Sequence, residues 1–378
     1  MHFTAIHLEN WANFKKLDLE LRSRVFIVGP NAAGKSNLLD AFRFLRDIVE
    51  RGLRHAVNEL RPGFSALRSL HAGAYSDVVL DMKMDLDGQA WRYELRLNQD
   101  KQRRIVVKSE TAWEGKDIRF SRGDDDSDPT AQSQTFLEQA QANKKFRAVA
   151  DFFRQVRYLH VVPQLVREPD RATAFRGHPF GAELLEQLSA FQRQNPRAFK
   201  GRLGAINKAL RVAVPRFQEL HLEKDDRGSP HLEARYDHWR ARGGWQSERQ
   251  FSDGTLRLFG LLWALLDGAG PLLLEEPELA LHPALVRELP GLIWRLSRRN
   301  TRQVFLSTHS AEMLQDPGIQ PDEVVLLQPG DKGTTAQTAD SLKEVIPLLN
   351  RRVPLSEIVL PHVAPKNVNQ LSLFTQPE

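Results

Sequence analysis

The chain has 378 residues, of which 41% are hydrophobic, so it can bury a sizeable core and is not intrinsically disordered. It has no cysteine, which excludes disulfides and thiolate metal sites and fits a reducing, cytoplasmic compartment. A net charge of +5 permits nucleic-acid contact without requiring it, and the N-terminus lacks a signal-peptide pattern.

Short strands are expected where apolar residues alternate with polar ones, or run together between turn residues. In chain order these are residues 2–9, 17–21, 25–28, 78–86, 91–97, 105–113, 157–162, 217–224, 231–238, 272–274, 304–306 and 324–327. Helices are expected where apolar residues recur at helical spacing. These are residues 38–49, 136–155, 182–193, 196–212, 252–266 and 284–296.

The first three strands are expected to form one sheet, with residues 78–113 as an antiparallel meander beside it. The last three strands suit buried parallel strands. The acidic stretch 121–134 is expected to be a flexible loop. Residues 256–274 are apolar enough to suggest a membrane span, but Asp267, Gly268 and Gly270 divide them into a helix and a strand, which favours buried core and no membrane.

One motif lies between the strand at 25–28 and the helix that follows. It matches G-x-x-x-x-G-K-[ST] throughout, in the strand–loop–helix context that a phosphate-binding loop requires. Its residues are Gly29, Pro30, Asn31, Ala32, Ala33, Gly34, Lys35 and Ser36, followed by Asn37. The glycines allow backbone N–H groups to face phosphate oxygens, while Lys35 is expected to reach the β- and γ-phosphates and Ser36 to ligate Mg²⁺.

A second motif supplies carboxylates. The strand at 272–274 ends in Glu275 and Glu276, which suits one group near Mg²⁺ and one that orients or deprotonates the attacking water. Glu275 is the candidate on the metal side and Glu276 the catalytic candidate. A solvated acidic turn is the alternative.

Two further positions carry polar groups at element ends. His309 follows the strand at 304–306 and is a candidate sensor of the γ-phosphate or the water, although a lone histidine is more often structural. Ser252, Asp253 and Gly254 begin an apolar helix, with Ser252 as N-cap and Gly254 leaving the backbone open to an anion. One nucleotide does not need two distant helix N-termini from one subunit. We therefore expect the helix N-terminus at Ser252 to contact the nucleotide that a partner chain binds.

These motifs, in this order, resemble the ATP-binding-cassette heads of the SMC, RecF and OLD ATPases. Residues 29–42 (GPNAAGKSNLLDAF) are especially similar to the sequence of this loop in SMC and RecF proteins. The resemblance covers most of the chain to about residue 330. It implies an α/β ABC-type P-loop head with a mixed central sheet, an antiparallel β subdomain, a helical insertion and no long coiled coil. It also implies a Walker A loop at 29–36, a signature motif at 251–257, Walker B at 272–276, a D-loop region at 278–283 and a switch histidine at His309. Gln164 stands where such heads carry a Q-loop glutamine that touches Mg²⁺.

In that group two heads enclose two ATP molecules, so the resemblance implies an ATP-dependent homodimer. The signature here is Phe-Ser-Asp-Gly-Thr, closer to stand-alone OLD-like ATPases than to transporters. The Glu-Glu ending of Walker B leaves the division of roles between Glu275 and Glu276 open. OLD nucleases continue into a nuclease domain, so any nuclease effector here is expected to be a separate protein.

The C-terminal stretch contains a pentapeptide that resembles the sliding-clamp-binding motif of bacterial polymerases and repair proteins. Its residues are Gln370, Leu371, Ser372, Leu373 and Phe374. An extended segment of this kind offers apolar side chains to a pocket, although it can equally pack on its own core.

Four segments follow from these assignments. They are an N-terminal ATPase lobe at 1–135, a helical insertion at 136–216, a C-terminal ATPase lobe at 217–360 and a flexible tail at 361–378. The favoured function is an ATPase in DNA repair or replication, with Arg235, Arg240 and Arg242 as candidate DNA contacts. The alternative is an ATPase sensor that controls a separate toxin or nuclease in phage defence. A transporter ATPase fits the altered signature poorly.

Overall fold

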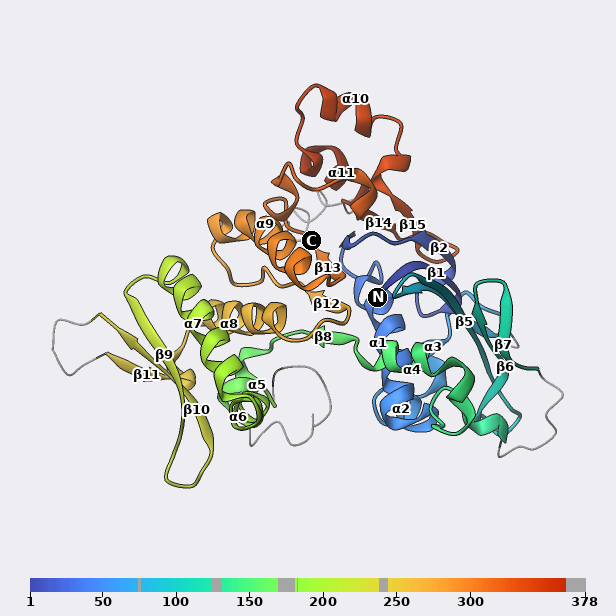
Figure 1. The fold of residues 1–378 in the computed structure, drawn as a ribbon. Coiled ribbons are helices and arrows are strands. Elements are labelled where there is room, and N and C mark those ends of the chain that lie inside the picture. Colours follow the sequence, from blue (N-terminus) through green and yellow to red (C-terminus); the bar gives the residue numbers. More distant parts are fainter. Residues whose placement is uncertain (74–75, 124–130, 169–180, 182, 238–243, 365–378) are drawn as a thin grey trace, which may run out of the picture. The chain divides into compact units, whose positions relative to one another are not determined.

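The computed structural model describes residues 1–378 except 74–75, 124–130, 169–180, 182, 238–243 and 365–378 (Figure 1). The chain divides into two compact units, Met1–Arg154 with Ser307–Glu378, and Gln155–Leu306. We call these unit 1 and unit 2 and describe each by itself. This division is by compactness, so the four segments assigned from motif content stay a prediction.

Unit 1 contains a six-stranded antiparallel sheet in the order β2-β1-β4-β5-β6-β7. The strands are β1 (His2–Trp11), β2 (Phe14–Glu20), β4 (Val78–Leu86), β5 (Gln89–Gln99), β6 (Ile105–Glu114) and β7 (Asp117–Arg122). The predicted meander is confirmed. The expectation that the first two strands share a sheet with the third is wrong, because β1 pairs with β4 along most of its length.

The third strand, β3 (Arg24–Val28), is buried at every position and lies parallel to β14 (Val324–Gln328). β14 in turn pairs antiparallel with β15 (Thr335–Thr338). Arg24 fixes the start of β3 through buried hydrogen bonds to Glu323, at 2.9 and 2.6 Å. The paired, fully buried β3 gives the following loop a rigid base.

The helices of unit 1 are α1 (Lys35–Arg51), α2 (Leu53–Asn58), α3 (Phe64–Leu67), α4 (Arg147–Arg154), α10 (Val345–Asn350) and α11 (Leu355–Val363). Helix α1 packs beside α4 (Figure 1). Phe3 of β1 contacts Phe42 of α1 and Phe152 of α4, with ring centroids 4.8 and 4.7 Å apart. This aromatic core joins the antiparallel sheet to the helix that follows β3.

Two expectations for residues 121–155 are wrong in part. Ser121 and Arg122 belong to β7, and 124–130 of the expected loop lies outside the described residues. The expected helix at 136–155 begins only at Arg147, after a short 3₁₀ helix at Ala142–Phe146. In the stretch before these helices, the buried carboxylate of Glu110 on β6 accepts the backbone N–H groups of Phe136 and Leu137 at 2.7 and 2.8 Å.

Unit 2 contains a parallel pair, β8 (Arg157–Leu159) and β12 (Leu272–Glu275), and an antiparallel sheet in the order β11-β10-β9. The strands of that sheet are β9 (Phe217–Lys224), β10 (Pro230–Tyr236) and β11 (Trp245–Ser247). Strand β13 (Val304–Thr308) neighbours β12 and ends in residues assigned to unit 1. The helices of unit 2 are α5 (Pro163–Arg167), α6 (Leu184–Gln194), α7 (Pro196–Ala213), α8 (Asp253–Leu266) and α9 (Pro283–Asn300).

The apolar stretch at 256–274 is buried core, as predicted. Helix α8 has most of its residues buried, and its Phe259 and Trp263 belong to a core cluster with residues of α6, α7, β9 and β10. Strand β12 is buried at its three leucines. Within the described part of the chain, the helices are too short or too polar to cross a bilayer.

His231 at the start of β10 gives unit 2 a pH-dependent contact. Its Nδ1 lies 2.8 Å from Glu248 Oε1 and its Nε2 lies 3.5 Å from Asp225 Oδ2. The hydrogen bond to Glu248, opposed by burial and aided by Asp225, raises the pKa of His231 above its ordinary 6.5. This contact therefore stabilises the fold fully below pH 6.5, and the stabilisation is lost as pH rises through the raised pKa.

We therefore expect His231→Gln to lower the free energy of unfolding at pH 6 and to have a smaller effect at pH 8.5. Urea unfolding across this range measures the difference. His221→Gln, on β9, is the control, since His221 Nε2 lies 3.4 Å from Glu219 Oε2, a longer contact than the one between His231 and Glu248. Equal losses at both pH values would contradict the assignment.

Candidate functional site

The loop between β3 and α1 has the backbone of an anion cradle. Gly34 has φ 94° and is the N-cap of α1. The first turn of α1 contains no acidic residue. A Cβ at Gly29 would lie 3.0 Å from the carbonyl oxygen of Leu327, so the loop requires glycine there as well. The N–H groups that begin α1 are thus positioned for an anion at the positive end of the helix.

Lys35 is drawn into this loop. Its side chain is 7% exposed, and Nζ donates to the carbonyl oxygens of Gly29 and Pro30 at 3.0 and 3.4 Å. An ammonium group held by carbonyl oxygens can exchange these contacts for phosphate oxygens. Ser36 follows in the first turn of α1, on the same loop.

Asn13, in the turn between β1 and β2, braces the loop, and the sequence analysis missed it. Its Nδ2 donates to the carbonyl oxygen of Ala32 at 3.2 Å, and its Oδ1 accepts from Asn37. The Trp11 indole donates to the carbonyl oxygen of Asn37 at 2.8 Å. These contacts give Asn37 a positioning role, while its expected contact with nucleotide stays a prediction. The signal available in the sequence was an asparagine in a two-residue turn.

We expect Asn13→Ala to weaken ATP binding by roughly fivefold, because the brace consists of hydrogen bonds worth about 1 kcal/mol each. Titration of a fluorescent ATP analogue measures this effect. Asn300→Ala in unit 2 is the control, since Asn300 makes one long hydrogen bond, 3.4 Å, to the carbonyl oxygen of Leu265. An unchanged affinity for the Asn13 variant would show that the loop holds its shape unaided.

A cavity of about 1060 Å³ in unit 1 joins the loop to His309. Gly29, Pro30 and Asn31 line one part of it, and the exposed His309 lines another. Thr308 Oγ1 accepts the backbone N–H of Ser310 at 3.0 Å and so fixes the turn that carries His309. The structure therefore brings together two of the elements predicted from distant stretches.

The wall of the same cavity includes the end of α11, which the sequence analysis did not connect with the site. Leu360, His362, Val363 and Ala364 all line the cavity. His362 is anchored by Glu344, 3.0 Å away, and its carbonyl oxygen accepts from Gln328 at 3.2 Å. Residues 361–363 are therefore helical, although the tail was expected to begin at Pro361.

In unit 2 the two glutamates occupy different positions. Glu275 ends β12, and the hydroxyl of Tyr158 on the paired strand β8 donates to its Oε2. Glu276 follows with φ 43°, a left-handed conformation that is uncommon for a residue with a side chain. Strained backbone of this kind concentrates at functional sites. Tyr158 was not predicted, because strand pairing decides its position.

The signature residues begin α8 as expected. Ser252 is the N-cap, and its Oγ accepts the backbone N–H of Thr255 at 3.1 Å. A Cβ at Gly254 would lie 2.5 Å from the carbonyl oxygen of Ala280, so only glycine fits. The N-terminus of α8 is thereby packed directly against the turn that follows Glu276.

Arg167 links the signature to α5, the short helix that carries Gln164. Its Nη2 donates to Asp253 Oδ1 and to the carbonyl oxygen of Phe251, each at 2.6 Å. This contact holds Asp253 in an ion pair within the same unit, while its contact with nucleotide stays a prediction. Gln164 itself is exposed in α5, and its contact with metal also stays a prediction.

Arg257, one turn into α8, places a positive charge near the Walker B turn. Burial lowers its pKa, and the carboxylates of Asp253 and Glu276 partly offset this. Its Nε is buried and makes no hydrogen bond within the described residues.

A magnesium ion at this type of site relies on few protein ligands. Among the described residues there is no cluster of three or more His, Asp or Glu side chains that could hold a metal alone. Mg²⁺ usually takes one or two protein oxygens and completes its shell with phosphate and water. Ser36 and Glu275 each offer a single side-chain carboxylate or hydroxyl group of this kind, and their contact with Mg²⁺ stays a prediction.

Two sets of predicted contacts are not tested by the structure. The pentapeptide at 370–374, together with Arg240 and Arg242, lies outside the described residues. Arg235 is described, and its Nε is 2.9 Å from Glu219 Oε1. An arginine that already pairs with a carboxylate is a weaker candidate for a DNA phosphate.

Comparison with known proteins adds one family and one fold. A family model described as "AAA domain, putative AbiEii toxin, Type IV TA system" matches residues 24–314. No curated protein matches the sequence. Two crystal structures of Smc heads are similar, one bound to the C-terminal winged-helix domain of ScpA and one bound to a ScpA C-terminal domain derived from Pyrococcus furiosus. Their TM-scores are 0.57 and 0.51, at 13% and 14% identity.

These alignments cover 92% and 93% of this chain and 100% and 99% of the Smc heads. At such low identity the similarity concerns the fold alone. The predicted fold class, an α/β ABC-type ATPase head, is confirmed.

Proposed function

Because the chain belongs to the family described as "AAA domain, putative AbiEii toxin, Type IV TA system", we propose that it binds and hydrolyses ATP. The observation that carries this proposal is the loop before α1, in which a left-handed Gly34 begins the helix and the buried Lys35 follows it directly. The matching family region includes this loop, the two glutamates and His309.

In the proposed reaction the backbone of residues 29–36 and the Lys35 ammonium bind the phosphates. Ser36 and Glu275 would hold Mg²⁺, which would neutralise phosphate charge. Glu276 accepts the proton of the attacking water. His309 senses the γ-phosphate, a role supported by its position in the wall of the cavity next to the loop.

We further propose that two chains enclose the nucleotides. Ser252 is exposed at the N-terminus of α8, and Gly254 follows in the first turn of the helix. Each chain thus offers two helix N-termini, one at the Walker A loop and one at the signature. In the simplest arrangement, each ATP contacts the helix N-terminus at the Walker A loop of one chain and the helix N-terminus at the signature of the other chain.

Ser252→Arg tests this arrangement. An arginine side chain at an exposed N-cap should block the face that meets the partner's nucleotide, so hydrolysis should fall by at least about 100-fold while ATP binding to the same chain's loop persists. Mixing this variant with Lys35→Ala should restore part of the activity, because one of the two mixed sites is then intact. No recovery on mixing, together with a rate per molecule that does not change on dilution, would contradict a shared site.

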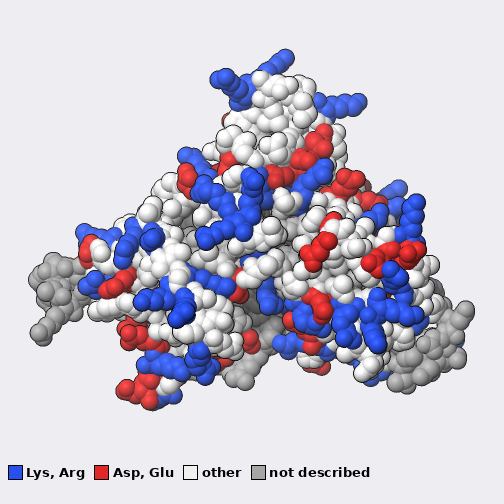
Figure 2. Space-filling view, viewed as in Figure 1, with Lys and Arg blue, Asp and Glu red and all other residues white. Residues whose placement is uncertain are grey.

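In a role at DNA, the surface of α7 would contact the phosphate backbone. This helix has no acidic residue, and its exposed positions include Arg197, Lys200, Lys208 and Arg211 on one side. Figure 2 shows Lys and Arg mixed with Asp and Glu over much of the visible face, so net charge by itself does not locate a DNA surface. A helix with an unmixed basic side is better suited to a phosphate backbone. Recruitment by a sliding clamp through residues 370–374 belongs to this proposal.

The second candidate is an ATPase sensor that controls a separate toxin or nuclease. The family description, which names a putative toxin of a toxin–antitoxin system, favours it. Heads of this fold also bind other proteins, since both Smc heads were solved with part of ScpA. Co-purification distinguishes the two candidates. An effector that co-elutes favours the sensor, whereas clamp binding that is lost on deleting residues 370–374 favours the replication or repair role.

A further inference from the structure

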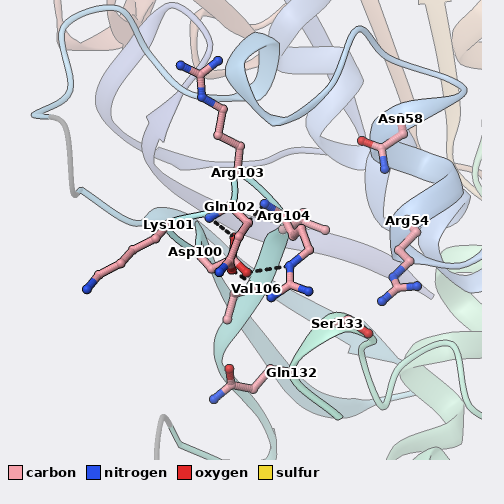
Figure 3. A pocket seen from close by; sticks show the side chains of 11 residues that line it. Arg54, Asn58, Asp100, Lys101, Gln102, Arg103, Arg104, Val106, Gln132 and Ser133 are labelled. Atoms are coloured by element: carbon pink, nitrogen blue, oxygen red, sulfur yellow. Dashed lines mark hydrogen bonds and ion pairs between the residues drawn. The ribbon is translucent and has the colours of Figure 1, made fainter. Parts of the chain in front are cut away.

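A second polar pocket lies in unit 1, between α2 and the turn that joins β5 to β6 (Figure 3). Its volume is about 810 Å³, within the range of small-ligand sites. It is lined by Arg54 and Asn58 of α2, residues 100–106, and Gln132 and Ser133. It shares no lining residue with the cavity at the Walker A loop, so the two are separate sites.

The lining is strongly basic. It contains four cationic side chains, those of Arg54, Lys101, Arg103 and Arg104, against one carboxylate, that of Asp100. Asp100 Oδ1 accepts the backbone N–H groups of Gln102 and Arg104, at 2.9 and 2.8 Å, and its Oδ2 accepts Arg104 Nε at 2.7 Å. The carboxylate is thus used in shaping the turn, and an excess of positive charge remains.

The orientation of the cations separates two of them from the others. In Figure 3 the side chains of Arg54 and Arg104 extend toward the same part of the pocket, beside Ser133, whereas those of Lys101 and Arg103 point away. Two guanidinium groups directed at one space repel each other unless an anion lies between them. The Arg104 group is held in place by Asp100 and by Gln102 Oε1, 2.9 Å from Nη2, so it does not need to be ordered on binding.

We propose that this pocket binds a phosphate-bearing ligand of nucleotide size, with Arg54 and Arg104 as the residues that hold the phosphate. The planar fork of arginine matches phosphate oxygens, and the hydroxyl and amide groups of Ser133, Gln132 and Asn58 suit the remaining polar atoms. The phosphate belongs either to a free nucleotide or to the end of a nucleic-acid strand. The proposal does not depend on the ATPase function, because it uses none of the same residues.

The test uses the full-length Lys35→Ala protein, so that the Walker A loop does not contribute, and titrates it calorimetrically with inorganic pyrophosphate. We expect saturable binding that weakens by about tenfold or more in Arg54→Glu, since each charge-assisted hydrogen bond is worth about 1.5–3 kcal/mol. Arg104→Gln should behave alike. Arg104→Gln changes the turn as well as the charge, because Arg104 is bonded to Asp100. The test of the phosphate site is therefore decided by the variant of Arg54, which is exposed.

Arg103→Gly is the matched control within the same turn. It removes one positive charge that points away from the pocket, and it relieves the left-handed φ of 61° at this residue. Its affinity should stay within about twofold of the parent, with no loss of thermal stability. Absence of pyrophosphate binding in the Lys35→Ala protein, or binding that Arg54→Glu leaves unchanged, overturns the proposal.

A dinucleotide with and without a 5′-phosphate identifies the source of the phosphate. If the phosphorylated form binds more tightly than the unphosphorylated form, and does so through Arg54, the ligand is the end of a strand. If pyrophosphate binds and neither dinucleotide does, the ligand is a free nucleotide. Both results support the phosphate site.

Discussion

Lys35→Ala is expected to weaken ATP binding by at least about 100-fold, because Lys35 is the buried cation of the loop and would contact two phosphates. The fold should persist, because alanine favours the first turn of α1. The loss should therefore appear in titration with a fluorescent ATP analogue and not in thermal unfolding of the protein without nucleotide.

Lys16→Ala is the matched control for Lys35→Ala. Lys16 lies in β2 of the same unit, is largely exposed and is 3.7 Å from Asp18. Lys16→Ala changes the net charge by the same amount as Lys35→Ala and should leave ATP affinity unchanged. Tight ATP binding by the Lys35 variant would contradict the assignment of residues 29–36 as the nucleotide loop.

Glu276→Gln is expected to bind ATP normally, to hydrolyse it about 10²–10⁴-fold more slowly and to accumulate as an ATP-bound dimer. Glutamine has the same shape and can adopt the same turn, but it cannot accept a proton. Single-turnover hydrolysis, with size-exclusion chromatography in the presence of ATP, measures both effects. Normal turnover would assign the base to another residue.

Glu275→Gln separates the roles of the two carboxylates. Tyr158 can still donate to a glutamine oxygen at this position, so the local structure should persist. If Glu275 acts on the metal side, this variant should need more Mg²⁺ to reach half-maximal rate, whereas Glu276→Gln should show the same Mg²⁺ dependence as the parent. The reverse pattern would exchange the two roles.

Several features of the site could be predicted because they depend on residues close together in sequence. The loop at 29–36 with its flanking strand and helix, the N-cap at Ser252 and the buried strand before Glu275 all follow from local spacing. The separate sheet of β1 and β2 and the late start of α4 could not. The first depends on pairing with β4, and the stretch before α4 is bonded to the buried Glu110; both partners are distant in sequence.

The sequence by itself determined that this chain carries a phosphate loop, a carboxylate pair and a helix N-terminus suited to anions, because glycine, lysine, glutamate and serine impose those properties wherever they occur in these patterns. Only the tertiary structure decided which distant residues support them. Asn13 braces the loop, Tyr158 contacts Glu275, Ala280 leaves space only for Gly254, and α11 borders the cavity of His309. These contacts depend on strand pairing and close packing, which no local pattern records.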